Sequence, residues 1–335
     1  MNPELHKRCR SLRFGAHIEI VVSEYERVAL SVPALVEGAR LEAKDLLATG
    51  KGGVEGKYTL DEHLAYLERA GAVRAGRPLL VLGARNNLVN LRAPVILNGR
   101  AHAVAGEDPE LSRRPYYGIG LRAGRLVVDR ALGGTDRSAD WPEFFCAGIP
   151  ALWDGLADPD LLELMLTEAG DHSHLFYLPR GIHPDATPES RSAWQYLHDA
   201  FLAGLLADAA TAGRSMGGAL ADIHPPLARS HDYLHAVLGV AEDGALVAVF
   251  AHGRLEEVGR LAARHGCRRA VCLENSGSIM PTYLPDGLAG ERIPLLRAPN
   301  FRPRGRAALV LELPGAGFEV LPLGLAAAAA RGGVG

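Results

Sequence analysis

Two short turn signals constrain this chain to a β-rich fold. Asn98-Gly99 separates two short apolar runs, and Asn-Gly is the dipeptide that most favours a two-residue hairpin turn. Ala123-Gly124 separates another pair of such runs and predicts a second hairpin. Residues 17–22 and 78–84 are also short, apolar and rich in β-formers. Short strands at regular spacing predict a β-rich core.

Helical patterns surround this core. Residues 24–50 have helical spacing, and Thr59 with Glu62 forms a capping-box pattern that predicts a helix ending near Ala70. Residues 157–222 contain two further periodic stretches and predict a helical insertion that forms a lid or wall of a pocket. The expected fold class is therefore α+β, a β-rich core with an N-terminal helical segment and a helical insertion.

The same patterns give a domain organisation. We expect an N-terminal strand and helical segment over residues 1–77 and one β-rich domain over residues 78–322 that carries the insertion. Residues 323–335, rich in Ala and Gly, read as a flexible tail.

Composition excludes several classes of function. The chain has 335 residues, 48% of them hydrophobic, and a net charge of −3 without a block of like charges, so we expect neither a nucleic-acid nor a membrane partner. The charged start has no apolar segment typical of a secretory signal, and four cysteines are too few for a disulfide framework. These features predict a cytoplasmic protein. The sequence leaves homo-oligomerisation open.

The stretch from residue 266 to 280 carries the clearest functional signal. The apolar run 270–273 predicts a buried strand, and it stops at residues 274–278, Glu-Asn-Ser-Gly-Ser. Such a turn exposes backbone N–H groups that can hold an anion or an oxygen-rich ligand, and a carboxyl group at the strand end can serve as a general acid or base. The alternative is an ordinary strand followed by a polar turn.

Residues 236–313 resemble the C-terminal half of the phosphodiester glycosidase family. The shared order is an apolar strand, a small-residue motif, a variable hairpin, an Arg-containing stretch and a final apolar strand at 307–313. The resemblance implies a β-rich fold and hydrolysis of a glycosidic or sugar-phosphodiester bond in a small polar metabolite.

The motif itself has diverged. Glu274 stands where the family has Asp, and Asn275 and Ser276 replace two glycines, whereas Gly277 and Ser278 match. His235 occupies the position of a family Arg, which removes the fork-shaped cation best suited to a phosphodiester.

The resemblance also implies roles for individual residues. Glu274 is expected to be the acid–base group and His235 a second proton-transfer group. The residues expected to contact the substrate are Asn86, Arg229, Asn275, Ser276, Ser278 and Arg292. Arg229 either replaces the missing family cation or lies at the surface. His231 and His235 are spaced as metal ligands on a helix, but the surrounding residues read as a strand entry, so neither a metal nor another cofactor is expected.

Three functions remain open on the sequence. The first is a diverged glycosidase-like hydrolase, in which the altered carboxyl group is retained for catalysis. The second is a biosynthetic enzyme that performs cyclisation, hydrolysis or group transfer on a natural-product intermediate. The third is a binding protein that kept the scaffold and lost the chemistry.

Overall fold

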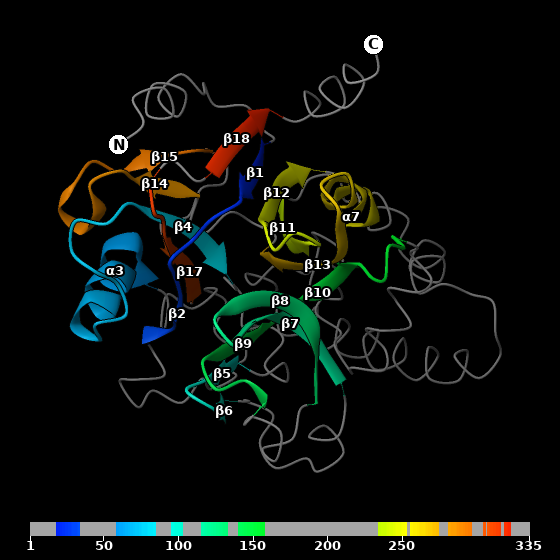
Figure 1. Ribbon diagram of the computed structural model, residues 1–335, viewed down its shortest axis with the longest axis horizontal. Coiled ribbons are helices and arrows are strands. Elements are labelled where there is room, and N and C mark those ends of the chain that lie inside the picture. Colours follow the sequence, from blue (N-terminus) through cyan, green and yellow to red (C-terminus); the bar gives the residue numbers. More distant parts are fainter. Residues whose placement is uncertain are drawn as a thin grey trace, which may run out of the picture.

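A computed structural model describes the strands and helices that build three antiparallel sheets (Figure 1). It describes residues 18–33, 58–84, 95–102, 115–132, 140–157, 234–252, 255–274, 281–296, 304–305, 307–315 and 318–322. The β-rich core predicted from the turn signals is confirmed.

The first sheet has six strands and carries the predicted site. Their order across the sheet is β10 (Ile149–Leu152), β13 (Cys267–Glu274), β11 (Leu234–Ala241), β12 (Leu246–His252), β1 (Ile18–Val22) and β18 (Phe318–Pro322). β1, the predicted opening strand, lies antiparallel between β12 and β18. Helix α7 (Leu255–Ala263) covers one face, where Val258 and Ala262 pack against valines of β11 and β12.

The second sheet has five strands and is covered by helix α3 (Leu60–Arg69). Its order is β15 (Ile293–Pro294), β14 (Thr282–Leu284), β4 (Leu79–Ala84), β17 (Ala307–Glu312) and β2 (Arg27–Ser31). The predicted capping box starts α3: the Glu62 N–H donates to Thr59 Oγ1 at 3.2 Å, and the Thr59 N–H donates to Glu62 Oε2 at 2.6 Å. The helix predicted after Thr59 is thereby confirmed.

The third sheet contains both predicted hairpins. Its order is β6 (Arg100–His102), β5 (Val95–Leu97), β9 (Phe144–Ala147), β7 (Pro115–Arg122) and β8 (Arg125–Leu132). Asn98-Gly99 and Ala123-Gly124 join their strands with positive φ at all four residues, as a type I′ turn requires. A short pair, β3 (Tyr58–Thr59) with β16 (Arg304–Gly305), and a 3₁₀ turn, Gly287–Ala289, complete the described elements.

One apolar core lies between the three sheets. It combines side chains from all of them, among them Ile20, Leu82, Ile119, Leu238 and Leu309, each with no more than 1% of its surface exposed. Strands β7 and β8 contact β13 as well, so the third sheet packs across the strand that carries the predicted site.

The N-terminal segment departs from the sequence prediction. Residues 27–31, inside the stretch predicted as helical, form β2 and pair with β17 from Arg27↔Glu312 to Ser31↔Ala308. These residues form a strand because the free energy of pairing with the buried β17 exceeds their weak local preference for a helix. Residues 34–50 and the predicted insertion at 157–222 beyond Ala157 lie outside the described residues. Strands from both sides of the predicted division at residue 78 share the first two sheets.

Two hydrogen bonds of His63 tie α3 to strands β2 and β16. His63 is fully buried; its Nε2–H donates to the Gly305 carbonyl at 3.0 Å, and its Nδ1 accepts from Ser31 Oγ at 2.8 Å. Burial lowers the pKa of His63 to about 4, against the smaller upward effect of the Gly305 hydrogen bond. His63 is therefore a neutral structural histidine at neutral pH.

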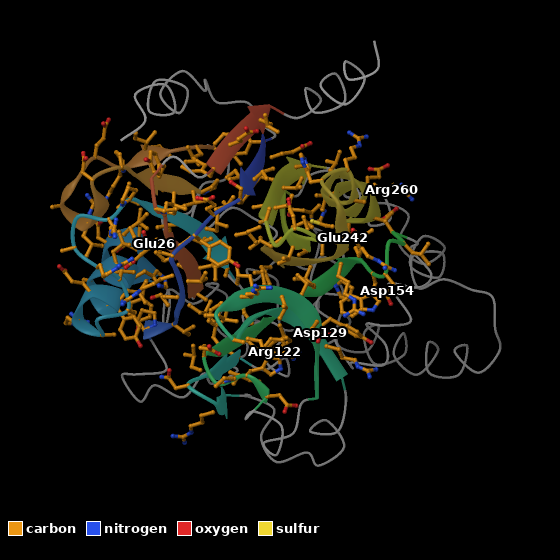
Figure 2. All side chains as sticks on the ribbon, viewed as in Figure 1. Glu26, Arg122, Asp129, Asp154, Glu242 and Arg260 are labelled. Atoms are coloured by element: carbon orange, nitrogen blue, oxygen red, sulfur yellow. The ribbon has the colours of Figure 1, made fainter. Side chains whose placement is uncertain are left out.

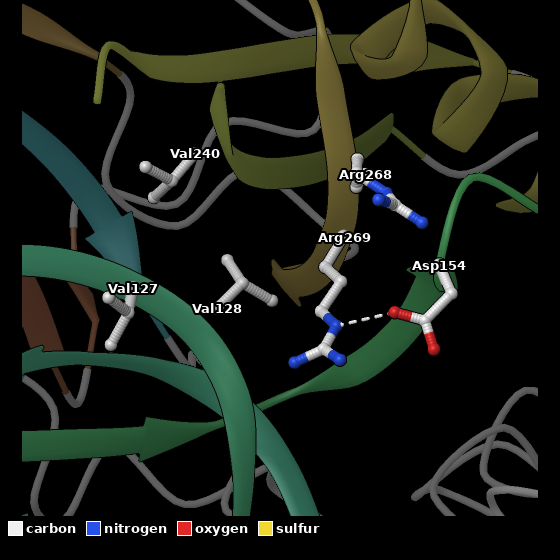
Figure 3. Close-up of a pocket in the computed structure, with 6 residues that line it drawn as sticks. All are labelled: Val127, Val128, Asp154, Val240, Arg268 and Arg269. Carbon is white, nitrogen blue, oxygen red and sulfur yellow. Dashed lines mark hydrogen bonds and ion pairs between the residues drawn. The ribbon is translucent and has the colours of Figure 1, made fainter. Parts of the chain in front are cut away.

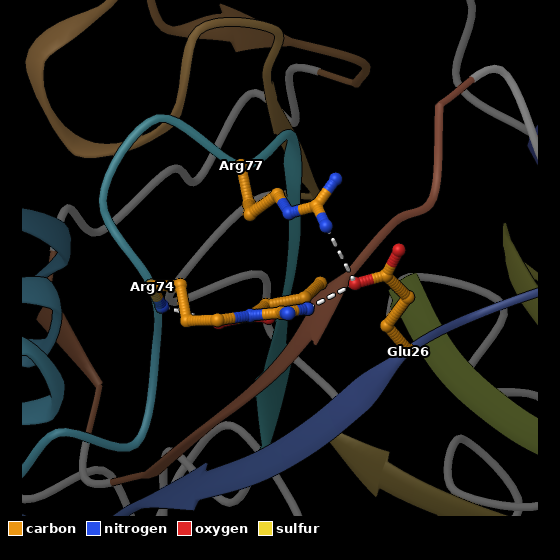
Figure 4. Close-up of polar contacts among 4 residues, drawn as sticks. Glu26, Arg74 and Arg77 are labelled. Carbon is orange, nitrogen blue, oxygen red and sulfur yellow. Dashed lines mark hydrogen bonds and ion pairs between the residues drawn. The ribbon is translucent and has the colours of Figure 1, made fainter.

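The loop after α3 is held by a cation between two carboxylates (Figure 4). Arg74 Nε donates to Glu312 Oε2 at 2.7 Å, and its Nη2 also pairs with Glu26. Arg77 Nη2 lies 3.3 Å from the same oxygen of Glu26. Glu312 is only 1% exposed, so Arg74 supplies the charge that a buried carboxylate needs. The hydrogen bond to Glu312, which has the largest effect, and the one to Glu26 raise the pKa of Arg74.

Candidate functional site

Strand β13 carries the predicted site at its carboxyl end. Its residues 270–273 are all less than 7% exposed, which confirms the buried strand expected there. Glu274 is the last residue of β13, so the apolar run ends at the carboxyl-bearing position, as expected from the sequence. Asn275, Ser276 and Ser278 lie outside the described residues.

The strand next to β13 brings His235 to the same end of the sheet. His235 is the second residue of β11, and its neighbour Ala236 is the Cα partner of Glu274. The histidine is half-buried, and its Nδ1 lies 3.9 Å from Cys272 Sγ. The register thus brings the backbones of these two positions close together, although His235, beside Cys272, lies on the α7 face of the sheet and Ala236, the partner of Glu274, lies on the opposite face.

The ladder between these strands is irregular at this point. Ala236 pairs with Glu274 but Val237 pairs with Cys272, so Leu273 is the extra residue of a β-bulge. A bulge breaks the alternation of side chains and bends the strand that contains it. The irregularity therefore coincides with the last two residues of β13.

Three other predicted residues come from elsewhere. Asn86 and Arg229 lie outside the described residues, but β4 ends at Ala84, two positions before Asn86. β4 contacts β13, and the arrowheads of the two strands approach each other in Figure 1. Arg292 is exposed beside the edge strand β15, where its Nη2 lies 2.6 Å from Asp61 Oδ1 of α3.

The described thiols have the character of packing groups. Cys146, Cys267 and Cys272 are buried thiols that form no disulfide within the described part of the chain. Burial, with a smaller contribution from Asp243, raises the pKa of Cys267 to about 12. A thiol with so high a pKa is not a nucleophile near neutral pH.

A pocket of about 580 Å³ opens at the other end of β13 (Figure 3). It is lined by Val127, Val128, Asp154, Val240, Arg268 and Arg269. Glu274 is five residues further along the strand from Arg269, roughly 17 Å at the rise of a β-strand. None of these residues was among the predicted site residues. The one signal for the pocket in the sequence was the pair of adjacent arginines, Arg268 and Arg269, at the start of a strand.

Within the described part of the chain, no cluster of His, Cys, Asp and Glu could hold a metal ion.

Comparisons with known proteins give only distant similarity. No family model and no curated protein sequence matches the chain. Among solved structures, it is similar to the catalytic domain of zebrafish N-acetylglucosamine-1-phosphodiester alpha-N-acetylglucosaminidase, with 10% identity and a TM-score of 0.40 over 90% of this chain and 73% of that chain. A hypothetical protein from Synechocystis aligns with 12% identity and a TM-score of 0.24 over 89% of this chain and 42% of that one. None of the described helices has the length and apolar character of a membrane span.

Proposed function

We propose that this protein is a hydrolase that cleaves a glycosidic or sugar-phosphodiester bond in a small polar metabolite at the carboxyl end of β13. The observation that carries the proposal is the register that makes Ala236, the neighbour of His235, the partner of Glu274, at a bulge in the strand. For both groups to act at one site, this bulge must direct the Glu274 side chain toward the face of His235. A carboxyl group and an imidazole on adjacent strands are two proton-transfer groups with different intrinsic pKa values. Bond cleavage at oxygen uses such a pair.

Each group has a distinct task in the proposed reaction. Glu274 protonates the leaving oxygen as its bond to the sugar carbon breaks, and His235 takes a proton from the attacking water. Asn275, Ser276 and Ser278 orient the substrate through side chains and loop N–H groups, and Asn86 and Arg229 contact it from neighbouring segments. Arg292 leaves its surface ion pair with Asp61 and pairs with an anionic substrate instead. The loss of the ion pair costs little, because exposed pairs of this kind contribute only about 0–1 kcal/mol to stability.

The bulge at Leu273 supports this location. β-bulges are over-represented next to active sites, because the extra residue redirects the side chains beside it. One of the two register shifts in the β11–β13 ladder lies at the residues to which the chemistry is assigned, and the other lies between Gly239 and Ala241. An ordinary strand end does not require such a shift.

A substrate search tests the proposal directly. Purified protein is incubated with p-nitrophenyl glycosides, with bis(p-nitrophenyl) phosphate and with a metabolite extract, and consumed compounds are identified by mass spectrometry. Hydrolysis of a glycosidic or phosphodiester bond supports the proposal. A product that is larger than, or isomeric with, its substrate indicates the biosynthetic alternative instead. Retention of a metabolite without turnover indicates a binding protein.

A further inference from the structure

We propose that the pocket at the start of β13 binds a small organic anion, a carboxylate or phosphate carried on an apolar body. The proposal does not rest on the proposed hydrolase, because the pocket lies at the opposite end of β13 from Glu274. Its volume of about 580 Å³ is within the range of small-molecule sites, about 300–1,000 Å³.

The wall of the pocket is divided into an apolar and a charged half. Val127 and Val128 of β8 and Val240 of β11 lie on one side in Figure 3, and Asp154, Arg268 and Arg269 lie on the other. Ligand sites combine such an apolar surface with a few polar groups that fix orientation. A ligand with one apolar end and one polar end matches this division.

Arg269 is held in place before any ligand arrives. Its Nε donates to Asp154 Oδ1 and its Nη1 to Asp129 Oδ1, both at 2.9 Å, and its Cζ lies 4.6 Å from the Trp153 ring centroid. The two acidic partners come from different elements, the turn after β10 and strand β8 (Figure 2). These bonds use two of the five N–H groups of the guanidinium, so the others can donate to an oxyanion. A fixed guanidinium binds at a low cost in side-chain entropy.

Arg268 supplies the charge that makes the site selective for anions. It is exposed, and within the described part of the chain its side chain has no ion pair or hydrogen bond. Asp154 and Asp129 both pair with Arg269, and Asp129 also pairs with Arg122 at 3.4 Å. Three arginines thus face two aspartates, which leaves one positive charge uncompensated. Guanidinium groups bind carboxylate and phosphate oxygens with paired, charge-assisted hydrogen bonds.

The position of Asp154 is set by a tight turn. Asp154 and Gly155 have φ values of 50° and 87°, and Trp153 and Leu156 pair on either side of them. The Gly155 N–H donates to the Arg268 carbonyl at 2.8 Å, which fixes the turn on β13. Asn also tolerates positive φ, so Asp154→Asn removes the charge and keeps the turn.

Calorimetric titration of the full chain with phenyl phosphate tests the proposal. We expect saturable binding of phenyl phosphate, weaker binding of inorganic phosphate and no binding of benzyl alcohol, which has the ring but no charge. Arg268→Gln should weaken binding about tenfold through the loss of a charge-assisted pair. Asp154→Asn should strengthen it, because it removes the carboxylate that competes for Arg269. Arg264→Gln, which removes an exposed arginine outside the pocket, should leave affinity unchanged.

Arg268→Gln and Asp154→Asn are expected to change the affinity for phenyl phosphate in opposite directions, so either variant tests the proposal if the other folds poorly. Circular dichroism and thermal unfolding check that each variant keeps the native fold. Equal affinity for benzyl alcohol, no saturable binding of phenyl phosphate, or equal losses in Arg268→Gln and Arg264→Gln would each overturn the proposal. So would a well-folded Asp154→Asn variant with weaker binding.

Discussion

Glu274 and Ala236 are Cα partners across β13 and β11, and the ladder changes register immediately beyond them. The pairing brings the carboxyl-bearing end of β13 next to His235, 39 positions earlier in the sequence. This short stretch of backbone is where the proposed chemistry is assigned, and the surrounding sheets give it a rigid frame.

The buried His63 should make stability depend on pH. Its pKa is about 4 in the folded protein, below its ordinary value of 6.5, so the unfolded chain binds the extra proton between these values. Stability should be fully present above pH 6.5 and fall as the pH drops to about 4, by about 3 kcal/mol from this group. Urea unfolding across this range measures the loss. His63→Gln should flatten that part of the profile, and an unchanged slope would contradict the assignment.

The two type I′ turns should respond to substitution with opposite signs. Ala123 and Asn98 are both exposed and have a φ of 51°, a conformation that costs Asn less than Ala. Ala123→Asn should raise the free energy of unfolding by about 1 kcal/mol, and Asn98→Ala should lower it by a similar amount. Chemical denaturation of both variants provides the comparison. Equal shifts in one direction would show that backbone strain is not the cause.

Gly259 should be intolerant of a side chain although it lies inside a helix. A Cβ at this position of α7 would lie 1.8 Å from the carbonyl oxygen of Ala151 in β10. In a free helix Gly→Ala gains about 1 kcal/mol, but overpacking here should cost roughly 1–3 kcal/mol. We expect Gly259→Ala to lower the midpoint of thermal unfolding. A rise in that midpoint would mean that α7 is not seated on β10 as described.

The two arginines around Glu26 should differ in importance. Arg74→Met leaves the buried Glu312 without its cation, whereas Arg77→Met removes only a contact to a partly exposed carboxylate. Arg74→Met should therefore lower the thermal midpoint clearly more than Arg77→Met, which serves as the matched control. Similar midpoints for the two variants would place the stabilising contact elsewhere.

The parts of the fold that were predicted correctly are those set by interactions between residues close together in the sequence. The hairpins at Asn98-Gly99 and Ala123-Gly124, the capping box at Thr59 and the strand before Glu274 all depend on neighbouring residues, and all are present. The β2 strand was missed because its residues pair with β17, 277 to 285 positions away. The periodicity of neighbouring residues cannot reveal a partner strand so far away in the sequence.

The two candidate sites also differ in whether local sequence reveals them. The end of β13 was visible in the sequence because an apolar run stops there at a carboxyl group. The pocket was not, because its walls come from β8, β11, β13 and the turn after β10. Only the packing of the third sheet on the first brings Val128 and Val240 to the same pocket wall. The Asp154 carboxylate reaches Arg269 only when the turn after β10 and strand β13 are both in place.

The most direct test of the proposed hydrolase is the turnover of Glu274→Gln on a compound that the wild-type protein hydrolyses. Gln keeps the size of the side chain and removes its titratable proton. Glu242→Gln, an exposed residue in the turn after β11, is the matched control, and circular dichroism confirms the fold of both variants. We predict that kcat falls by a factor of about 100 or more in Glu274→Gln and stays at the wild-type value in Glu242→Gln. Wild-type turnover in a folded Glu274→Gln variant would contradict the account.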